Sequence, residues 1–164
     1  MTDLREVGTQ IRDAAGGLIL ADHVLARIVA FLPGPTIFVD ADLPAHLAAD
    51  PGSVFIISGS TVLLATFQNA VTVDPSVPHN RSSVEVATWR RSDLRRISLE
   101  GGLEGRNSDF DWQSALGEAW PRGAVVTLSY KDHQTVRLPL AKYPSDLQVA
   151  AARSITQELL ADLA

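Results

Sequence analysis

The stretch that decides the fold is residues 122–164, RGAVVTLSYKDHQTVRLPLAKYPSDLQVAAARSITQELLADLA. Two apolar, β-branched runs, Val125–Tyr130 and Thr135–Leu140, flank a polar segment at 132–134, a pattern that predicts a strand hairpin. The run Ser145–Leu163 has helical spacing and follows the hairpin. We therefore expect two antiparallel strands followed by one amphipathic helix.

The apolar faces of the two strands predict how this hairpin pairs. Apolar residues alternate along both strands, and cross-strand partners must lie on the same side of the sheet. A two-residue loop would set Leu128 opposite Arg137 and split the apolar faces, so we expect a three-residue loop with a bulge at 132–134. The expected partners are Tyr130 with Val136, Leu128 with Leu138, and Val126 with Leu140.

The helix that follows carries one apolar stripe. Ser145 can cap its first turn, and Asp146 interacts favourably with the helix dipole there. Such a stripe is suited to plugging an open end of a barrel or to packing on one sheet. Its members lie four residues apart and are Leu147, Ala151, Ile155, Leu159 and Leu163.

A second hairpin is predicted upstream by the runs Val54–Ser58 and Thr61–Phe67, which flank Gly59-Ser60. A Gly-X pair suits a two-residue type II′ turn. Both faces of this hairpin are apolar, so one lines a core and the other is covered by a helix or by a partner chain. The helix predicted over Asp3–Ala15 is the obvious cover, whereas a partner chain would make the protein a homodimer. The predicted pairs are Ile57 with Val62, Phe55 with Leu64, Ile56 with Leu63, and Val54 with Ala65.

The remaining sequence predicts mainly strands and loops. Gly16-Gly17 ends the first helix, and the apolar run His23–Leu32 is closed by Pro33-Gly34-Pro35. The segment Phe110–Trp120 is compatible with a short helix. Short strands are predicted at Thr36–Asp40, Ala70–Val73, Ser83–Arg90 and Leu94–Leu99, and loops at 41–52, 74–82 and 100–109.

The composition is that of one globular domain. A chain of 164 residues, 46% hydrophobic and 20% charged, can bury a sizeable core without a metal or a disulfide. The absence of cysteine excludes disulfides, thiolate metal sites and cysteine nucleophiles. Twelve of the fourteen basic residues are arginine and alanine is abundant, a bias typical of a high-GC bacterial genome.

Charge and hydropathy predict a cytoplasmic protein. The net charge of −5 argues against nucleic acid and membrane surfaces as partners, because both repel an acidic domain. The N-terminal MTDLREVGTQ has neither the basic nor the apolar region of a signal peptide. Apolar runs such as Val24–Leu32, which Arg27 interrupts, are shorter than the roughly 20 residues of a membrane span. We therefore expect no transmembrane segment.

The order of the expected elements, with the TLSYKDHQTVRLPL-to-helix ending, resembles the pleckstrin-homology-like (PH-like) fold. The bacterial members that it resembles are small cytoplasmic domains, often of unassigned function. The resemblance implies an α+β, mainly β, fold: an antiparallel open barrel of about seven strands with a C-terminal helix at 21–164, and an extra N-terminal helix at 1–20. Lipid-binding members carry basic residues in the loop between their first two strands. The expected equivalent, Leu32–Thr36, has none, which argues against phosphoinositide binding.

Two groups of residues are candidates for binding a partner. The run 89–96 holds four arginines and one aspartate, a local charge of +3, with a tryptophan as anchor. The same run also fits a solvated turn with paired surface charges. The tryptophans at 112 and 120 suit an exposed docking surface, although such side chains more often fold back onto a core. The candidates are Trp89, Arg90, Arg91, Arg95, Arg96, Trp112 and Trp120.

The sequence contains no pattern that predicts catalysis. The histidines are scattered without metal-ligand spacing, and there is no G-x-S-x-G elbow. The carboxylates Asp40, Asp42 and Asp50 do not match a calcium loop. We therefore expect neither an enzyme nor a metal or cofactor, although a triad of dispersed residues stays open because its members can come from anywhere in a chain.

Two binding functions follow from these observations. We prefer a non-catalytic binding or adaptor domain that acts through protein–protein contacts or self-association. The alternative is a carrier of a small apolar ligand, with a pocket between a curved sheet and the C-terminal helix, as in helix-grip folds. A closed pocket there of about 300 Å^3 or more would support the carrier.

Overall fold

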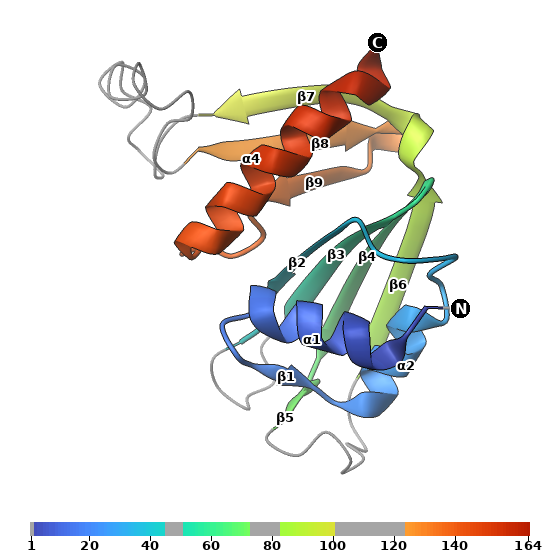
Figure 1. The fold of residues 1–164 in the computed structure, drawn as a ribbon, viewed down its shortest axis with the longest axis vertical. Coiled ribbons are helices and arrows are strands. Elements are labelled where there is room, and N and C mark those ends of the chain that lie inside the picture. The colour runs from blue at the N-terminus through green and yellow to red at the C-terminus, as the bar shows by residue number, and fades with distance from the viewer. Residues whose placement is uncertain (1, 45–50, 73–82, 101–123) are drawn as a thin grey trace. The chain divides into compact units, whose positions relative to one another are not determined.

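The computed structural model describes residues 2–44, 51–72, 83–100 and 124–164. The chain falls into two compact units, Met1–Ser92 and Asp93–Ala164. Antiparallel strands dominate both units, and a helix lies at the C-terminal end (Figure 1). These features confirm the coarse prediction of a mixed α and β fold made mainly of antiparallel sheets with a C-terminal helix. The domain boundary expected after residue 20 stays a prediction.

The first unit is built around a four-stranded antiparallel sheet. Its elements are α1 (Leu4–Ala14), β1 (Ile19–Leu20), α2 (Asp22–Val29), β2 (Phe38–Asp42), β3 (Gly52–Ser58), β4 (Thr61–Gln68), β5 (Val71–Thr72) and β6 (Ser83–Arg90). The 3-10 turn η1 (Arg91–Asp93) follows β6 and spans the boundary between the two units. The central sheet has the strand order β2-β3-β4-β6, and β1 pairs separately with β5.

The β3–β4 hairpin has the predicted register. All four predicted pairs are present, among them Ile57 with Val62 and Ile56 with Leu63. Gly59 has a φ of +56°. A type II′ turn requires a positive φ at its first central residue, and glycine adopts it without a Cβ clash. The two-residue loop therefore determines which residues face each other.

Helix α1 covers one face of this sheet, as predicted. The Asp3 carboxylate accepts the Arg5 backbone N–H at 2.9 Å and caps the first turn. Gly16, at a φ of +67°, follows the last turn. The buried cluster that joins α1 to the sheet includes Val7, Ile11, Val54, Ile56 and Leu63.

The apolar run after α1 is a second helix and not the first strand of a barrel. The resemblance, by placing the loop between the first two strands at Leu32–Thr36, implied a strand for this run, but a short apolar run fits a strand or a buried helix equally well by periodicity. The segment Leu32–Thr36 therefore joins α2 to β2 and is not the loop between the first two strands of the sheet. In the sequence, β2 and β3 are separated by residues 43–51, which also contain no lysine or arginine. The buried residues of α2 are Val24, Leu25 and Ile28.

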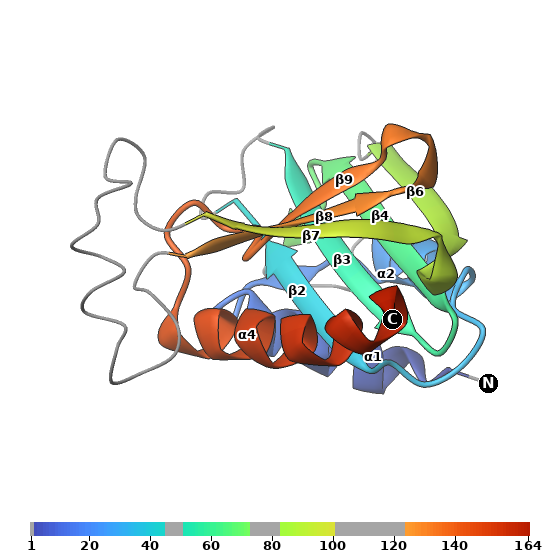
Figure 2. The ribbon, with the colours of Figure 1, turned by 90° about the horizontal axis from the view of Figure 1, so that it is seen from above.

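The second unit combines a three-stranded antiparallel sheet with the C-terminal helix. Its elements are β7 (Leu94–Glu100), β8 (Val125–Tyr130), the 3-10 turn η3 (Lys131–His133), β9 (Thr135–Leu138), α4 (Asp146–Leu160) and the 3-10 turn η4 (Ala161–Leu163). The strand order is β7-β8-β9, and α4 runs alongside this sheet (Figures 1 and 2). Strand β9 ends at Leu138, before the predicted Leu140, because Pro139 has no N–H to continue the ladder.

The register of the β8–β9 hairpin differs from the prediction by two residues. The Tyr130 N–H donates to the Gln134 carbonyl oxygen (2.8 Å), which closes a three-residue loop at 131–133 and not at 132–134. The apolar faces still match, because a shift of two residues keeps every side chain on its face. The predicted bulge is not in this hairpin; the register shift lies between β7 and β8. The pairs are Ser129 with Thr135, Leu128 with Val136, Thr127 with Arg137, and Val126 with Leu138.

The buried face of α4 contains Ile155 and Leu159 of the predicted stripe but differs from it at the helix ends, and the predicted cap is confirmed. The Ser145 hydroxyl oxygen accepts the Gln148 N–H at 3.2 Å, and the Gln148 side chain accepts the Ser145 N–H at 3.1 Å. Leu147, however, is 78% exposed. Residues four apart drift around a helix by about 40° per step, so a long stripe of this spacing cannot stay on one face. The buried residues are Ala152, Ile155, Thr156 and Leu159.

The other predicted elements are partly covered by the structure. Strands β5, β6 and β7 confirm the short strands expected near Ala70–Val73, Ser83–Arg90 and Leu94–Leu99. The loop predicted at 74–82 and the helix predicted at Phe110–Trp120 lie outside the described residues. The connector predicted at 100–109 also lies outside them, except for Glu100 at the end of β7.

Candidate binding sites

The first candidate site is one face of the three-stranded sheet in the second unit. Along β8 the residues Val126, Leu128 and Tyr130 are buried, whereas those between them are half-buried. On this second face, arginine and hydroxyl side chains neighbour one another: Arg96 pairs with Ser129 and Ser129 with Thr135, while Ser98 pairs with Thr127 and Thr127 with Arg137. We name it the basic sheet face and define it as Arg95, Arg96, Ser98, Thr127, Ser129, Thr135 and Arg137.

A β-bulge adds the second arginine of β7 to this face. Leu94 pairs with Tyr130 and Arg96 with Ser129, so Arg95 is an extra residue in the ladder. In a regular strand, Arg95 and Arg96 would point to opposite faces. The bulge makes both oppose the same partner residue and re-aims the extra side chain. Both arginines are exposed.

The basic sheet face carries a local positive charge. Arg96 and Arg137 stand on the two outer strands, about 10 Å apart across the sheet and about 7 Å along it. Glu100 shares the face at the far end of β7, so three arginines less one glutamate leave a charge of +2. Guanidinium groups bind carboxylates and phosphates through paired N–H donors. The face can therefore hold an acidic group between hydroxyl donors.

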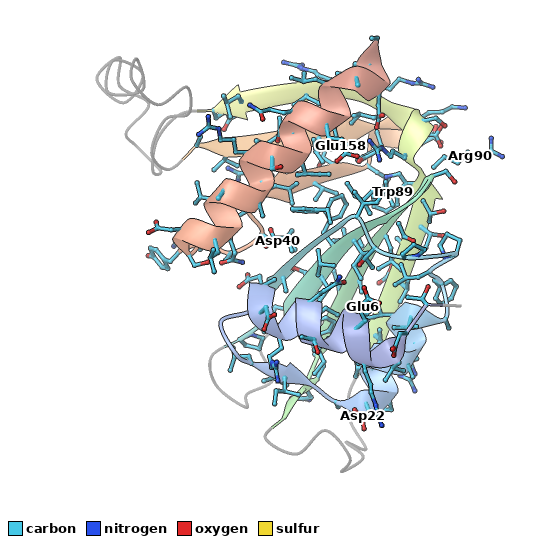
Figure 3. All side chains as sticks on the ribbon, viewed as in Figure 1. Glu6, Asp22, Asp40, Trp89, Arg90 and Glu158 are labelled. Carbon is cyan, nitrogen blue, oxygen red and sulfur yellow. The ribbon has the colours of Figure 1, made fainter. Side chains whose placement is uncertain are left out.

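The structure divides the predicted arginine cluster between the two units. Arg90 is exposed at the end of β6 and projects outward (Figure 3), and Arg91 follows in η1, where its backbone N–H donates to the Ser60 carbonyl oxygen at 2.7 Å. Trp89 is half-buried and pairs with Val62. These three belong to the first unit, whereas Arg95 and Arg96 belong to the second.

Trp112 and Trp120 lie outside the described residues, so their docking role stays a prediction.

Arg137 is a member of the basic sheet face that sequence reasoning missed. Its signal was present, because Arg137 occupies a polar position in the alternating strand Thr135–Leu138. Only the cross-strand pairing brings it to the face that holds Arg96.

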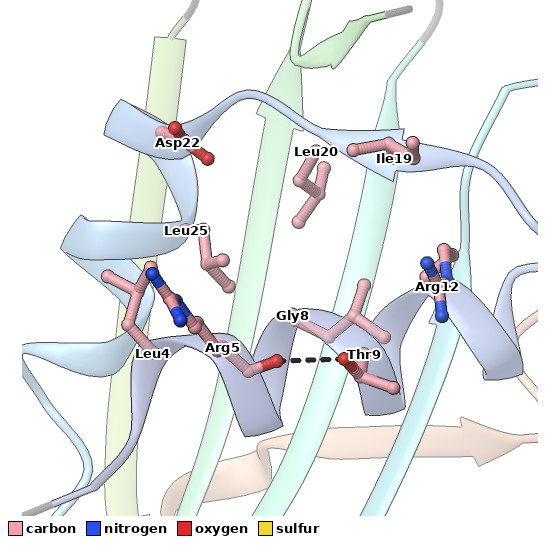
Figure 4. A pocket seen from close by; sticks show the side chains of 10 residues that line it. Leu4, Arg5, Gly8, Thr9, Arg12, Ile19, Leu20, Asp22 and Leu25 are labelled. Carbon is pink, nitrogen blue, oxygen red and sulfur yellow. Dashed lines mark hydrogen bonds between the residues drawn. The ribbon is translucent and has the colours of Figure 1, made fainter. Parts of the chain in front are cut away.

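The second candidate site is a cavity of about 370 Å^3 in the first unit (Figure 4). Helix α1 forms one wall, and β1 and the start of α2 form the other. We name it the α1 groove. The carrier hypothesis placed a pocket beside the C-terminal helix, but this cavity lies at the opposite end of the sequence. Its lining residues are Leu4, Arg5, Gly8, Thr9, Ile11, Arg12, Ile19, Leu20, Asp22 and Leu25.

The α1 groove has an apolar floor and a charged rim. Arg5, Thr9 and Arg12 are exposed on one side of α1, and the Thr9 hydroxyl donates to the Arg5 carbonyl oxygen at 2.9 Å. Gly8 lies between them, where an added Cβ would come within 2.9 Å of Leu25 Cδ2. Glycine is destabilising inside a helix, and this close approach of α2 explains why it is present.

Two carboxylates of β2 share the sheet face that points away from α1. Asp40 is 2% exposed, and one of its carboxylate oxygens accepts the Ala41 N–H at 2.9 Å. Burial raises the pKa of Asp42 above its ordinary value. Asp50, the third carboxylate considered, lies outside the described residues. Within the described ranges, no three His, Asp or Glu side chains gather into a group that could hold a metal ion.

Comparisons with known proteins provide no relative for this chain. No protein-family model matches it, and no curated protein or solved structure is significantly similar to it. None of the helices that the structure describes is both long and apolar enough to cross a membrane.

Proposed function

We propose that this chain is a non-catalytic, PH-like binding domain that acts through protein–protein contacts at its basic sheet face. The observation that carries the proposal is the gathering of three exposed arginines, Arg95, Arg96 and Arg137, on one hydroxyl-rich sheet face of an acidic chain. Surface charges opposite to those of a partner steer it and set its orientation. The partner surface is therefore acidic.

An acidic protein segment suits this face better than nucleic acid or a membrane does. Proteins that bind single-stranded nucleic acid add aromatic stacking to charge, and the basic sheet face as defined contains no aromatic residue. The net charge of −5 opposes a long polyanion or an anionic bilayer. A short acidic segment meets only the local charge of the face.

The PH-like part of the proposal is supported by the order of the elements. The four strands β2, β3, β4 and β6 precede the three strands β7, β8 and β9, and the helix α4 follows them. The resemblance predicts that these strands belong to one open barrel. An experimental structure of the full chain tests this, and two sheets without a shared core would contradict it.

The binding proposal is tested with a fluorescein-labelled deca-glutamate peptide, followed by fluorescence anisotropy at low salt. We expect R96E/R137E to weaken binding about tenfold or more, because two favourable charge contacts become repulsive. The matched double R27E/R153E changes the net charge equally at two arginines of the helices α2 and α4, which are not members of the face. It is expected to change the affinity less than about twofold.

Two results would overturn the proposal. Equal losses in both double variants would assign the binding to net charge alone. Tighter binding of poly-uridylate RNA or of phosphatidylserine vesicles than of the peptide, abolished by R96E/R137E, would assign the face to another class of partner. Circular dichroism melting of each variant verifies that the fold is intact.

A further inference from the structure

We infer that the α1 groove binds a single-chain amphipathic carboxylate, with the apolar tail in the groove and the carboxylate at Arg5 and Arg12. All residues that line the groove belong to the first unit. The inference is therefore independent of the basic sheet face, which lies in the second unit.

The groove has the size and the lining that an acyl tail needs. Its volume of about 370 Å^3 is within the range of small-molecule sites. Ile11, Leu20 and Leu25 of its lining are buried residues of the core. They are held by their packing in the folded protein, so the apolar surface is present before a ligand arrives. Leu4 and Ile19 extend this surface toward solvent.

The two arginines of the rim are available to an anion. Arg5 and Arg12 are separated by about two helical turns, so they lie on the same side of α1, about 10 Å apart. Arg5 makes no ion pair with any residue that the structure describes. Arg12 contacts the exposed carboxylate of Asp13, at 3.7 Å from Nε. An exposed pair of this kind contributes little and is readily exchanged for a ligand carboxylate.

The charge balance of the groove lining favours a single negative charge. Asp22, at the start of α2, stands on the wall opposite Arg5 and Arg12 (Figure 4). Among the lining residues, two arginines less one aspartate leave a charge of +1, and the ligand carboxylate takes the place of Asp13, which contacts Arg12 from outside the lining. A monocarboxylate matches this charge, whereas a dianionic phosphate monoester is opposed by Asp22. The apolar floor then favours a carboxylate with a tail over a small polar anion.

The test is an NMR titration of the full-length ¹⁵N-labelled protein with decanoate below its micelle concentration. We expect saturable shifts at the amides of Thr9, Ile19 and Leu20. Octanoate is two methylenes shorter and is expected to bind about fifteenfold more weakly if both methylenes are buried. Decyltrimethylammonium has the same tail with a positive head group and is expected to bind at least about tenfold more weakly than decanoate.

Matched variants separate the rim from net charge. R5Q/R12Q is expected to weaken decanoate binding about tenfold. R27Q/R90Q removes two exposed arginines of the same unit that do not line the groove, and it is expected to change the affinity less than about twofold. Thr9→Trp fills the groove from an exposed helix position and is expected to abolish binding without lowering the melting temperature.

Three outcomes would overturn the inference. The first is equal binding of decanoate and decyltrimethylammonium, which would show that the rim does not select an anion. The second is an equal loss of affinity in R5Q/R12Q and R27Q/R90Q. The third is a set of shifts confined to residues outside α1, β1 and α2. All variants are surface substitutions, and a wild-type-like amide spectrum verifies that each is folded.

Discussion

The hairpins β3–β4 and β8–β9 close through different turns. The first turns through two residues, with Gly59 at a φ of +56°, and the second turns through 131–133, with Asp132 at a φ of +65°. Glycine reaches positive φ without a steric cost, whereas aspartate reaches it at some cost, which its short polar side chain reduces. The first turn therefore has a residue that suits its backbone conformation, whereas the second places a residue with some steric cost at a positive φ.

The difference teaches how a turn sets a register. A glycine at the first central position of a two-residue loop allows one frame, because only that residue takes the positive φ easily. In a loop without glycine, the register is set mainly by the requirement that the apolar faces of the two strands match. This requirement distinguishes a loop with an odd number of residues from one with an even number, but it does not distinguish two loops that both have an odd number. In β8–β9 the frames at 131–133 and 132–134 keep the same apolar faces. The hydrogen bond between Tyr130 and Gln134 decides between them.

The largest expected effect tests whether burial stabilises the two hairpins equally, each within its own unit. Leu63 of the first hairpin and Leu128 of the second are both 0% exposed. We expect Leu63→Ala and Leu128→Ala each to lower the free energy of unfolding by about 3 kcal/mol, through lost burial and a residual cavity. Urea denaturation measures both. Thr66→Ala, at an exposed position of β4, is the control and should cost less than about 0.5 kcal/mol. A loss below about 1 kcal/mol at either leucine would contradict equal stabilisation.

A smaller effect is expected at the turn of the first hairpin. No atom lies within 4 Å of a Cβ added at Gly59 or at Gly34, but only Gly59 has a positive φ. Gly59→Ala should therefore lower the free energy of unfolding by about 1 kcal/mol, from backbone strain alone. Gly34→Ala is the matched control and should be neutral or slightly stabilising, since alanine restricts the unfolded chain. Equal effects of the two substitutions would show that Gly59 does not determine the register of the β3–β4 hairpin.

The opposite sign is expected at the turn of the second hairpin. Asp132→Gly relieves the cost of a positive φ and should raise the free energy of unfolding by about 0.5 kcal/mol. Lys131 precedes it without a positive φ. Lys131→Gly should therefore lower stability slightly, because glycine makes the unfolded chain more flexible. Thermal melts of the two variants give the sign directly, and a destabilising Asp132→Gly would show that the aspartate side chain itself holds the turn.

The smallest effect concerns the sheet that contains the first hairpin. Burial raises the pKa of Asp42, on β2 next to β3, above its ordinary value of 3.8. The folded state therefore binds this proton more tightly than the unfolded state. The resulting stability is present below pH 3.8 and is lost as the pH rises through the raised pKa. Asp42→Asn lacks this dependence, so its stability relative to the wild type should increase between pH 3 and pH 7. Urea denaturation at both pH values measures the change, and a constant difference would contradict it.

Local chemistry explains which elements could be predicted. Gly59 marks a turn and Ser145 marks a cap through interactions within a few residues, and both features are where the sequence predicts them. The run His23–Leu32 has no such mark at its start, and its periodicity fits a strand as well as a helix. Its helical state depends on the packing of α2 in the core cluster of the first unit.

The candidate sites were less predictable than the elements. Arg95 and Arg96 were expected as a pair because they are adjacent in the sequence. Arg137 joins them only through the pairing of β7 and β9 with β8, and the bulge that re-aims Arg95 has no mark in the sequence. The α1 groove likewise needs α1, β1 and α2 to pack together before its floor exists.

The sequence by itself determined the cap of α4, the two-residue turn of the first hairpin, the odd length of the second loop and the net charge. These depend on backbone conformation and on contacts between residues close in the chain. The tertiary structure decided the state of α2, the frame of the β8–β9 loop, the buried face of α4 and the two sites. Those features are contacts between distant segments, and local sequence favours the competing arrangements almost equally until packing selects one of them.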